Sequence, residues 1–166
     1  MTSTIEEATL VLPDRFRDAM RRVASPVCVV TTFDEWGPHG TTVSAFTSLS
    51  MNPPMLMLSL DNLSRLLARV AVGARLGVNI LAADQPELAS RFAAKSDDKF
   101  DGIEWFADAD APRLAGCHAW VALDTRQIIP GGDHMVVFGE VVDAEACAGH
   151  LPLTYHDRTF GTHIEL

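Results

Sequence analysis

Residues 117–146, CHAWVALDTRQIIPGGDHMVVFGEVVDAEA, contain two long strand-like segments around one short turn. Both segments are rich in β-branched and apolar residues, the composition that is typical of strands. Pro130, Gly131 and Gly132 interrupt them, and these residue types favour the backbone angles of turns. The stretch therefore predicts a long hairpin, and it raises the question of why the turn ends in a histidine, His134.

Further strand-like segments precede this hairpin. They occupy residues 27–33, 41–50, 55–60, 75–81 and 103–106, and the turn between the first two predicts a second hairpin. Helical spacing and capping residues predict helices at 14–24, 65–72 and 84–94. The six or seven strands do not alternate regularly with helices, as they would in a parallel doubly wound sheet. The predicted fold is mainly β, an antiparallel barrel with three or so peripheral helices.

The length of 166 residues, 48% of them hydrophobic, fits one globular domain. Because neither a repeat nor a linker is evident, we expect this domain to span residues 13–166. Residues 1–12 carry acidic and hydroxyl side chains without the pattern of a buried face. We expect them to form a flexible N-terminal tail.

The net charge of −9 disfavours nucleic acid as the main partner, because an acidic surface repels a phosphate backbone. Any anionic ligand must therefore be held by a local feature. No apolar run approaches the roughly 20 residues that cross a bilayer, and the N-terminus lacks a signal-peptide pattern, so no membrane association is expected. The three cysteines leave at least one thiol free of internal disulfides. These observations predict a cytoplasmic protein.

Standard motifs such as G-x-G-x-x-G, H-E-x-x-H and G-x-S-x-G are missing, and the six histidines are scattered, so no metal site is predicted. One segment is rich in hydroxyl groups, with Thr41, Thr42, Ser44, Thr47 and Ser48. These side chains could line a ligand pocket. They could equally reflect the strand preference of threonine and the tolerance of serine at sheet edges, and the residues alone leave both readings open.

Several segments in a fixed order resemble the short-chain flavin reductases that serve two-component flavin-dependent monooxygenases. The matching segments are FRDAMRRVASPVCVVTT, TTVSAFTSLSMNPPM, VNIL followed by LASRFA, KFDGIEW, GGDH and PLTYHDRTF. Together they span about residues 14–160, and it is their joint order that is specific. The resemblance implies a flavin-binding split β-barrel, a homodimer, FAD or FMN as the flavin, and NADH or NADPH as the hydride donor, with the pair of NADH and FAD favoured.

The resemblance also implies roles for particular residues. The block from Thr41 to Ser48, including Val43, would line the isoalloxazine ring. Ser64 and Arg65 would receive the flavin phosphate, and the positive end of the predicted helix after Asn62 would support them. His134 would take part in nicotinamide binding and hydride transfer, with Asp133 orienting the loop or the imidazole. Phe92, Phe100 and Phe160 stand at positions where the family has residues beside the flavin, although aromatic residues at helical spacing also suit a core. Asn79, inside the apolar VNIL segment, needs either a backbone partner or the cofactor if it is buried, and the pocket role is favoured.

This sequence departs from the family pattern at three places. Gly40-Thr41-Thr42 stands where Gly-Met-Thr is common, and Leu66 stands where a threonine often follows the phosphate-binding serine. Phosphate contacts would therefore depend more on Arg65. Phe160 replaces a common tyrosine, which puts any hydroxyl role there in doubt.

The expected activity is hydride transfer from the pyridine nucleotide to the flavin, with release of reduced flavin to a partner monooxygenase. Two alternatives stay open. One is a flavin-binding carrier or sensor without turnover, and the other is a small-molecule-binding barrel that no longer binds flavin.

Overall fold

The computed structural model describes residues 2–166, with side chains from residue 11 onward. Its body is a seven-stranded antiparallel sheet in the order β3-β2-β6-β9-β10-β5-β4. The strands are β2 (Cys28–Asp34), β3 (Gly37–Val43), β4 (Phe46–Met51), β5 (Pro54–Asp61), β6 (Arg75–Ile80), β9 (Ala119–Gly131) and β10 (His134–Ala146). The predicted mainly β, antiparallel fold is confirmed.

The two edge strands of this sheet, β3 and β4, are adjacent in sequence. Only Ser44 and Ala45 separate them, and the three Cα–Cα steps from Val43 to Phe46 reach at most about 11 Å. In a flat sheet, six inter-strand spacings would hold the edges about 29 Å apart. The sheet must therefore curl until the end of β3 reaches the start of β4. No ladder joins β3 to β4 in residues 2–166, so the barrel has a seam between these two strands.

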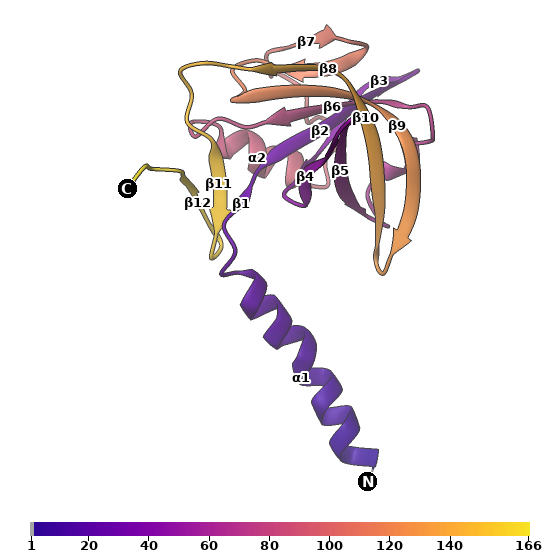
Figure 1. Cartoon of the computed structure of the whole chain (residues 1–166), viewed down its shortest axis with the longest axis vertical. Helices are drawn as coiled ribbons and strands as arrows, with labels where there is room; N and C mark the ends of the chain where they lie inside the picture. Colours follow the sequence, from indigo (N-terminus) through magenta and orange to yellow (C-terminus); the bar gives the residue numbers. More distant parts are fainter. Residues whose placement is uncertain (1) are drawn as a thin grey trace.

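The long hairpin of β9 and β10 is confirmed, and Figure 1 shows both strands curving along one side of the body. Close packing against the hairpin requires two glycines. A Cβ at Gly139 would lie 2.2 Å from the Leu123 side chain, and one at Gly77 would lie 2.4 Å from the Trp120 ring. The ladder shifts register after Phe138 and after Val141, which helps the hairpin to bend.

Two smaller sheets bring the strands of the described chain to twelve, more than the six or seven predicted. β1 (Ser25–Pro26) pairs with β11 (Leu153–His156), which pairs with β12 (Thr159–Thr162), and β7 (Trp105–Asp108) pairs with β8 (Ala111–Leu114). The turns of both new hairpins use non-glycine residues at positive φ, namely Ala109, Asp110, Asp157 and Arg158. Without glycine or asparagine, these turns lack the usual hairpin signal in sequence.

The helices differ from the prediction in two ways. α1 (Thr2–Met20) begins well before residue 14 and projects away from the barrel (Figure 1). The predicted helix at 65–72 is wrong, because only a short 3₁₀ turn, η1 (Leu67–Arg69), forms there before the chain extends at Val70. The third helix is confirmed as α2 (Pro86–Ala93), with Pro86 in its first turn. Across residues 2–166 no helix combines the length and apolar character needed to cross a membrane.

The core lies on both faces of β2, because successive side chains of a strand point to opposite faces. Val30 packs inside the barrel with Leu58, Leu76 and Leu123. Val29 faces the other way and packs with Phe92 of α2 and with its neighbours. α2 is thereby fixed against the outside of the barrel, close to β3.

Candidate functional site

Three adjoining hollows follow β3, and we refer to them together as the β3 groove. The first, about 190 Å³, is lined by residues that include Thr41, Ser64 and His134. The second, about 280 Å³, shares Thr41 and Ser64 and adds Arg65. The third, about 240 Å³, shares Arg65 and adds Phe100. Because neighbouring hollows share lining residues, the three lie in a row from the tip of the β9–β10 hairpin to the loop after α2.

The hairpin turn brings His134 to the first hollow. His134 pairs with Asp61 across the β10–β5 ladder, and the Asn62 amide donates a hydrogen bond to the Asp133 carbonyl oxygen at 3.0 Å. His134 Nδ1 lies 2.7 Å from the Asp133 carboxylate. Hydrogen bonding to His134 holds the pKa of the Asp133 carboxyl below its ordinary value. Of the two turn glycines, only Gly132 takes the positive φ that glycine favours, at 72°, whereas Gly131 has no positive φ.

The second hollow collects positive charge. The sequence has only two lysines, Lys95 and Lys99, and both line this hollow with Arg65 and the hydroxyl of Ser64. Lys99 Nζ donates to the carbonyl oxygens of Phe92 at 2.8 Å and Gly40 at 3.2 Å. Burial and then the neighbouring Arg65 charge lower the pKa of the Lys99 ammonium. In a protein of net charge −9, this hollow is a local feature that suits an anion.

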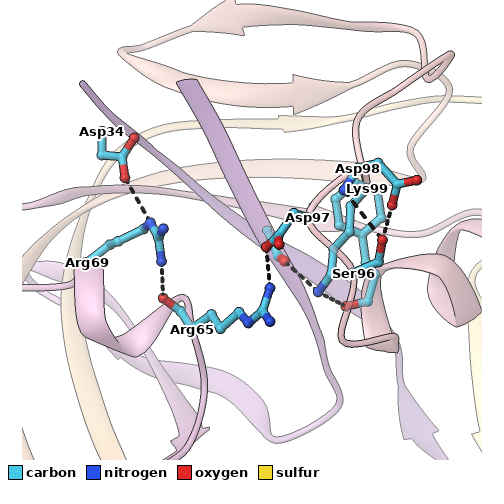
Figure 2. A network of polar contacts seen from close by, with 9 residues as sticks. Asp34, Arg65, Arg69, Ser96, Asp97, Asp98 and Lys99 are labelled. Carbon is cyan, nitrogen blue, oxygen red and sulfur yellow. Dashed lines mark hydrogen bonds and ion pairs between the residues drawn. The ribbon is translucent and has the colours of Figure 1, made fainter. Parts of the chain in front are cut away.

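The physical basis expected for this anion site needs a correction. The α-helix predicted directly after Asn62 does not form, so there is no helix macrodipole to support anion binding by Ser64 and Arg65. Arg65 instead forms an ion pair with the exposed Asp97, and Figure 2 shows the two side chains meeting at the groove. The lysines were not predicted as site residues, although Lys99 opens the KFDG segment. The signal that could have identified them is their spacing: the only two lysines of an acidic sequence lie within one five-residue segment.

The hydroxyl-rich block divides between several surroundings. Thr41, Thr42, Val43 and Ser44 all line the first hollow, although the Val43 side chain also belongs to the core. The Thr42 hydroxyl donates to the Ala89 carbonyl oxygen at 2.6 Å and so anchors α2. The predicted single strand at 41–50 is wrong, since Ser44 and Ala45 separate β3 from β4.

The remaining members of the block lie outside the β3 groove. Thr47 lines a larger hollow of about 660 Å³ that reaches α1. Phe160, which is not part of the block, lines a further hollow of about 380 Å³. That hollow shares Thr42 and Ser44 with the first hollow of the groove. Ser48 is exposed on β4 and lines none of the hollows described here.

Of three further residues predicted to contact the flavin, Asn79 and Phe92 lie in the core and only Phe100 reaches the groove. Asn79 is fully buried, donates to the Val29 carbonyl oxygen at 3.1 Å and accepts from the Leu114 amide at 2.7 Å, so its amide is satisfied by the core and not by a ligand. Phe92 is also fully buried and supports the groove from below, because a Cβ at Gly40 would lie 2.8 Å from its ring. Phe100 packs edge-on against Phe92 and does line the third hollow.

The residues of the groove fit a flavin nucleotide. A flat ring needs small neighbours with hydrogen-bonding groups, which the β3 segment from Gly40 to Ser44 supplies. A phosphate needs cations and a hydroxyl, which Arg65, the lysines and Ser64 supply. Fold and groove together define a split-barrel protein that is suited to a flat anionic cofactor, with a histidine at one end of the site.

The comparisons agree with this class. Residues 20–163 match the family model described as Flavin reductase like domain. The chain is 38% identical to an actinorhodin polyketide dimerase of Streptomyces coelicolor, covering 87% of this chain and 82% of that one. It is 35% identical to the reductase component of a 4-nitrophenol 4-monooxygenase/4-nitrocatechol 2-monooxygenase of Rhodococcus opacus, covering 90% and 80% of the two chains.

A solved structure is similar over nearly the whole chain. The NADH:FAD oxidoreductase of Streptomyces globisporus, in complex with NAD and FAD fragments, superposes with a TM-score of 0.86 at 27% identity, covering 92% of this chain and 93% of that one. The protein belongs to the flavin reductase-like domain family. It is an NAD(P)H-dependent flavin reductase of the kind that supplies two-component monooxygenases.

Proposed function

We propose that this protein reduces FAD with NADH in the β3 groove and releases the reduced flavin to a partner monooxygenase. The observation that carries the proposal is the adjacency of the hollows, which places His134, the short side chains of β3 and the cationic second hollow in one row. When bound there, a flavin supplies a ring that accepts a hydride from the nicotinamide.

The cationic hollow would hold the phosphate end of the flavin. Ser64 and Arg65 would bind it as expected, and Lys99 adds a third donor whose position is fixed by two carbonyl oxygens. The groove continues past this hollow toward His39 and Phe100. That room suits the adenosine of a dinucleotide and favours FAD over FMN, while relatives named NADH:FMN and NADH:FAD oxidoreductases favour NADH.

The ring end of the flavin would lie along β3. Thr41, Thr42, Val43 and Ser44 would contact it, mainly through the backbone groups of an edge strand. Phe160 would extend this surface, because its hollow shares Thr42 and Ser44. Phe100 would instead lie at the adenosine end, and Thr47 and Ser48 lie outside the groove. Asn79 and Phe92 would act indirectly, because the core encloses both side chains.

His134 would orient the nicotinamide, and Asp133 would orient His134. Hydride transfer needs positioning more than a covalent nucleophile. The buried thiols agree with that view, since burial raises the pKa of Cys117 to about 12 and also raises that of Cys28. Neither is a thiolate near neutral pH.

We also propose that residues 13–166 act as one domain and that two copies form a homodimer. Support for the dimer comes from α1, which projects from the barrel with exposed Phe16 and Met20. An apolar helix face of this kind usually has a partner in solution. The three thiols are free, which suits a reducing cytoplasm.

The test is to mix the purified protein with FAD or FMN and follow the oxidation of NADH and NADPH by absorbance. We expect turnover, with the highest kcat/KM for the pair of NADH and FAD. Flavin binding without turnover would indicate a carrier or sensor. No effect of flavin in any pairing would reject the proposed function.

A further inference from the structure

One arginine connects the phosphate-binding loop to the β2–β3 hairpin. Arg69 Nε donates to the Asp34 carboxylate at 2.8 Å, and Arg69 Nη1 donates to the Arg65 carbonyl oxygen at 2.6 Å. Figure 2 shows the guanidinium between these two groups. A single planar side chain thus fixes the backbone of Arg65 relative to the last residue of β2.

Asp34 is itself held from several directions. His39 Nε2 lies 2.8 Å from its carboxylate, and the Trp36 amide donates to it at 2.8 Å. Burial raises the pKa of Asp34, but these contacts and Arg69 outweigh burial and hold the pKa at about 2. The carboxylate is therefore charged at any pH near neutrality.

The loop after β5 is held before Arg65 by the amides of Leu63 and Ser64, which donate to Asp61 at 2.6 and 2.9 Å, so the contact from Arg69 adds a restraint at Arg65 itself. The loop forms only a three-residue 3₁₀ turn, and the Leu67 amide reaches the Ser64 hydroxyl at a long 3.5 Å. The Leu66 side chain is anchored in the core, but the side chain of Arg65 is 58% exposed. The contact from Arg69 is the one side-chain hydrogen bond to the Arg65 backbone within the described residues.

We propose that Asp34 and Arg69 are positioning residues, which set the placement of Ser64 and Arg65 for the flavin phosphate. The inference rests on the proposed function, because it assumes that the second hollow binds that phosphate. Arg69 also lines the third hollow, beside the proposed adenosine end, but neither residue needs to touch the phosphate to act in this way. Loss of the Arg69 contact would let the loop sample other positions, and misplaced binding groups weaken affinity steeply.

The structure offers a matched control. Arg75 Nε donates to Asp124 at 3.0 Å, and its Nη1 donates to the Ala109 carbonyl oxygen at 3.0 Å. These side chains are 27% and 26% exposed, against 30% and 22% for Arg69 and Asp34. The control ion pair joins β6 to β9 and lines none of the three hollows of the groove. Its variants therefore measure how the loss of a comparable ion pair outside the groove changes thermal stability and the KM for FAD.

The experiment compares Asp34→Asn and Arg69→Gln with Asp124→Asn and Arg75→Gln in the full-length protein. We expect the first pair to raise the KM for FAD about tenfold, with kcat at saturating FAD and the KM for NADH within about twofold of wild type. The control variants should leave the KM for FAD unchanged at a similar loss of thermal stability. The double variant Asp34→Asn/Arg69→Gln should be no worse than either single change, because the two residues act as one unit.

Two further measurements separate positioning from other roles. Arg69→Lys keeps the charge but loses the planar fork, so it should also raise the KM for FAD; a wild-type value would indicate a purely electrostatic role and overturn the proposal. Native hydrogen exchange should show faster exchange of the Arg69 and Val70 amides in Asp34→Asn. Equal KM values in all four single variants would likewise reject it. A wild-type protein that reduces no flavin would instead reject the proposed function, and the inference with it.

Discussion

Asn79 joins three strands at the centre of the protein. From β6 its amide group donates to Val29 of β2 and to Pro112 of β8, and its carbonyl oxygen accepts from Leu114. The sequence alone indicated that a buried asparagine needs partners, but it could not distinguish backbone partners from a cofactor. The partners come from strands 33 to 50 residues away, and two of them, Pro112 and Leu114, belong to the unpredicted β8.

Replacing this side chain tests the core role. Asn79→Leu should lower the free energy of unfolding by about 3 kcal/mol or more, because it leaves several buried backbone groups without partners. Urea denaturation measures this change. The KM for flavin of the folded variant should stay at the wild-type value. A raised KM at unchanged stability would return Asn79 to the flavin site.

His134 has a location that suits its predicted role, at the tip of a hairpin whose turn is fixed to the loop after β5. His134→Ala should lower kcat/KM for NADH about 10- to 100-fold, because the nicotinamide loses an orienting contact. Stopped-flow measurement of flavin reduction checks this expectation. His163→Ala, at an exposed position near the C-terminus, is the control. Equal kinetics in both variants would contradict the role of His134.

At the scale of elements, the sequence predicted best where a pattern is long or a turn carries glycine. The β9–β10 hairpin has two 13-residue strands and Gly132 at positive φ, and both features are visible in the residues. The β7–β8 and β11–β12 hairpins have four-residue strands and turns without glycine, so they left no comparable signal. The spacing of the apolar residues in segment 65–72 predicted a helix. In the structure a short turn and an extended segment bring Leu66 and Val70 into the core instead.

The loop after α2 contributes a negative charge next to the cations of the groove. Asp97 pairs with Arg65 (Figure 2), so its carboxylate is the counterion of Arg65 that the flavin phosphate would have to displace. Asp97→Asn should lower the Kd for FAD about two- to fivefold, because the phosphate no longer competes with a carboxylate for Arg65. Fluorescence titration measures it, and the gain should shrink in high salt. Asp84→Asn removes an exposed charge elsewhere and should have no effect; an equal gain there would indicate net charge alone.

At the scale of the whole molecule, the strand pattern predicted an antiparallel barrel, whereas its split form was predicted only through the resemblance to a family. Local periodicity describes each strand but not which edges meet, and the two-residue link from β3 to β4 read as continuous strand. The proposed association of two copies likewise has no signal in the pattern of the sequence. Its structural support is the apolar surface that α1 leaves exposed.

That surface gives a direct test of the homodimer. Phe16 and Met20 lie one helical turn apart on α1 and are 64% and 49% exposed. Phe16→Glu/Met20→Glu should convert the protein to a monomer at micromolar concentration, because charges would enter an apolar interface. Light scattering after size-exclusion chromatography measures the mass. Arg22→Glu, which changes charge at an exposed position, should leave the dimer intact. A wild-type protein that elutes as a monomer would reject this interface.

The seam between β3 and β4 has a consequence for how this protein can evolve. Each of these strands offers one edge of peptide groups that no other strand pairs within residues 2–166. A ligand recognised by those groups is recognised by atoms that every residue carries. Most substitutions of Thr41, Thr42 or Ser44 would then have little effect on recognition of the ring. Proline at the same positions would remove a backbone N–H donor. Diversity among such enzymes would accumulate in the cationic loop and the hairpin tip, where recognition depends on side chains.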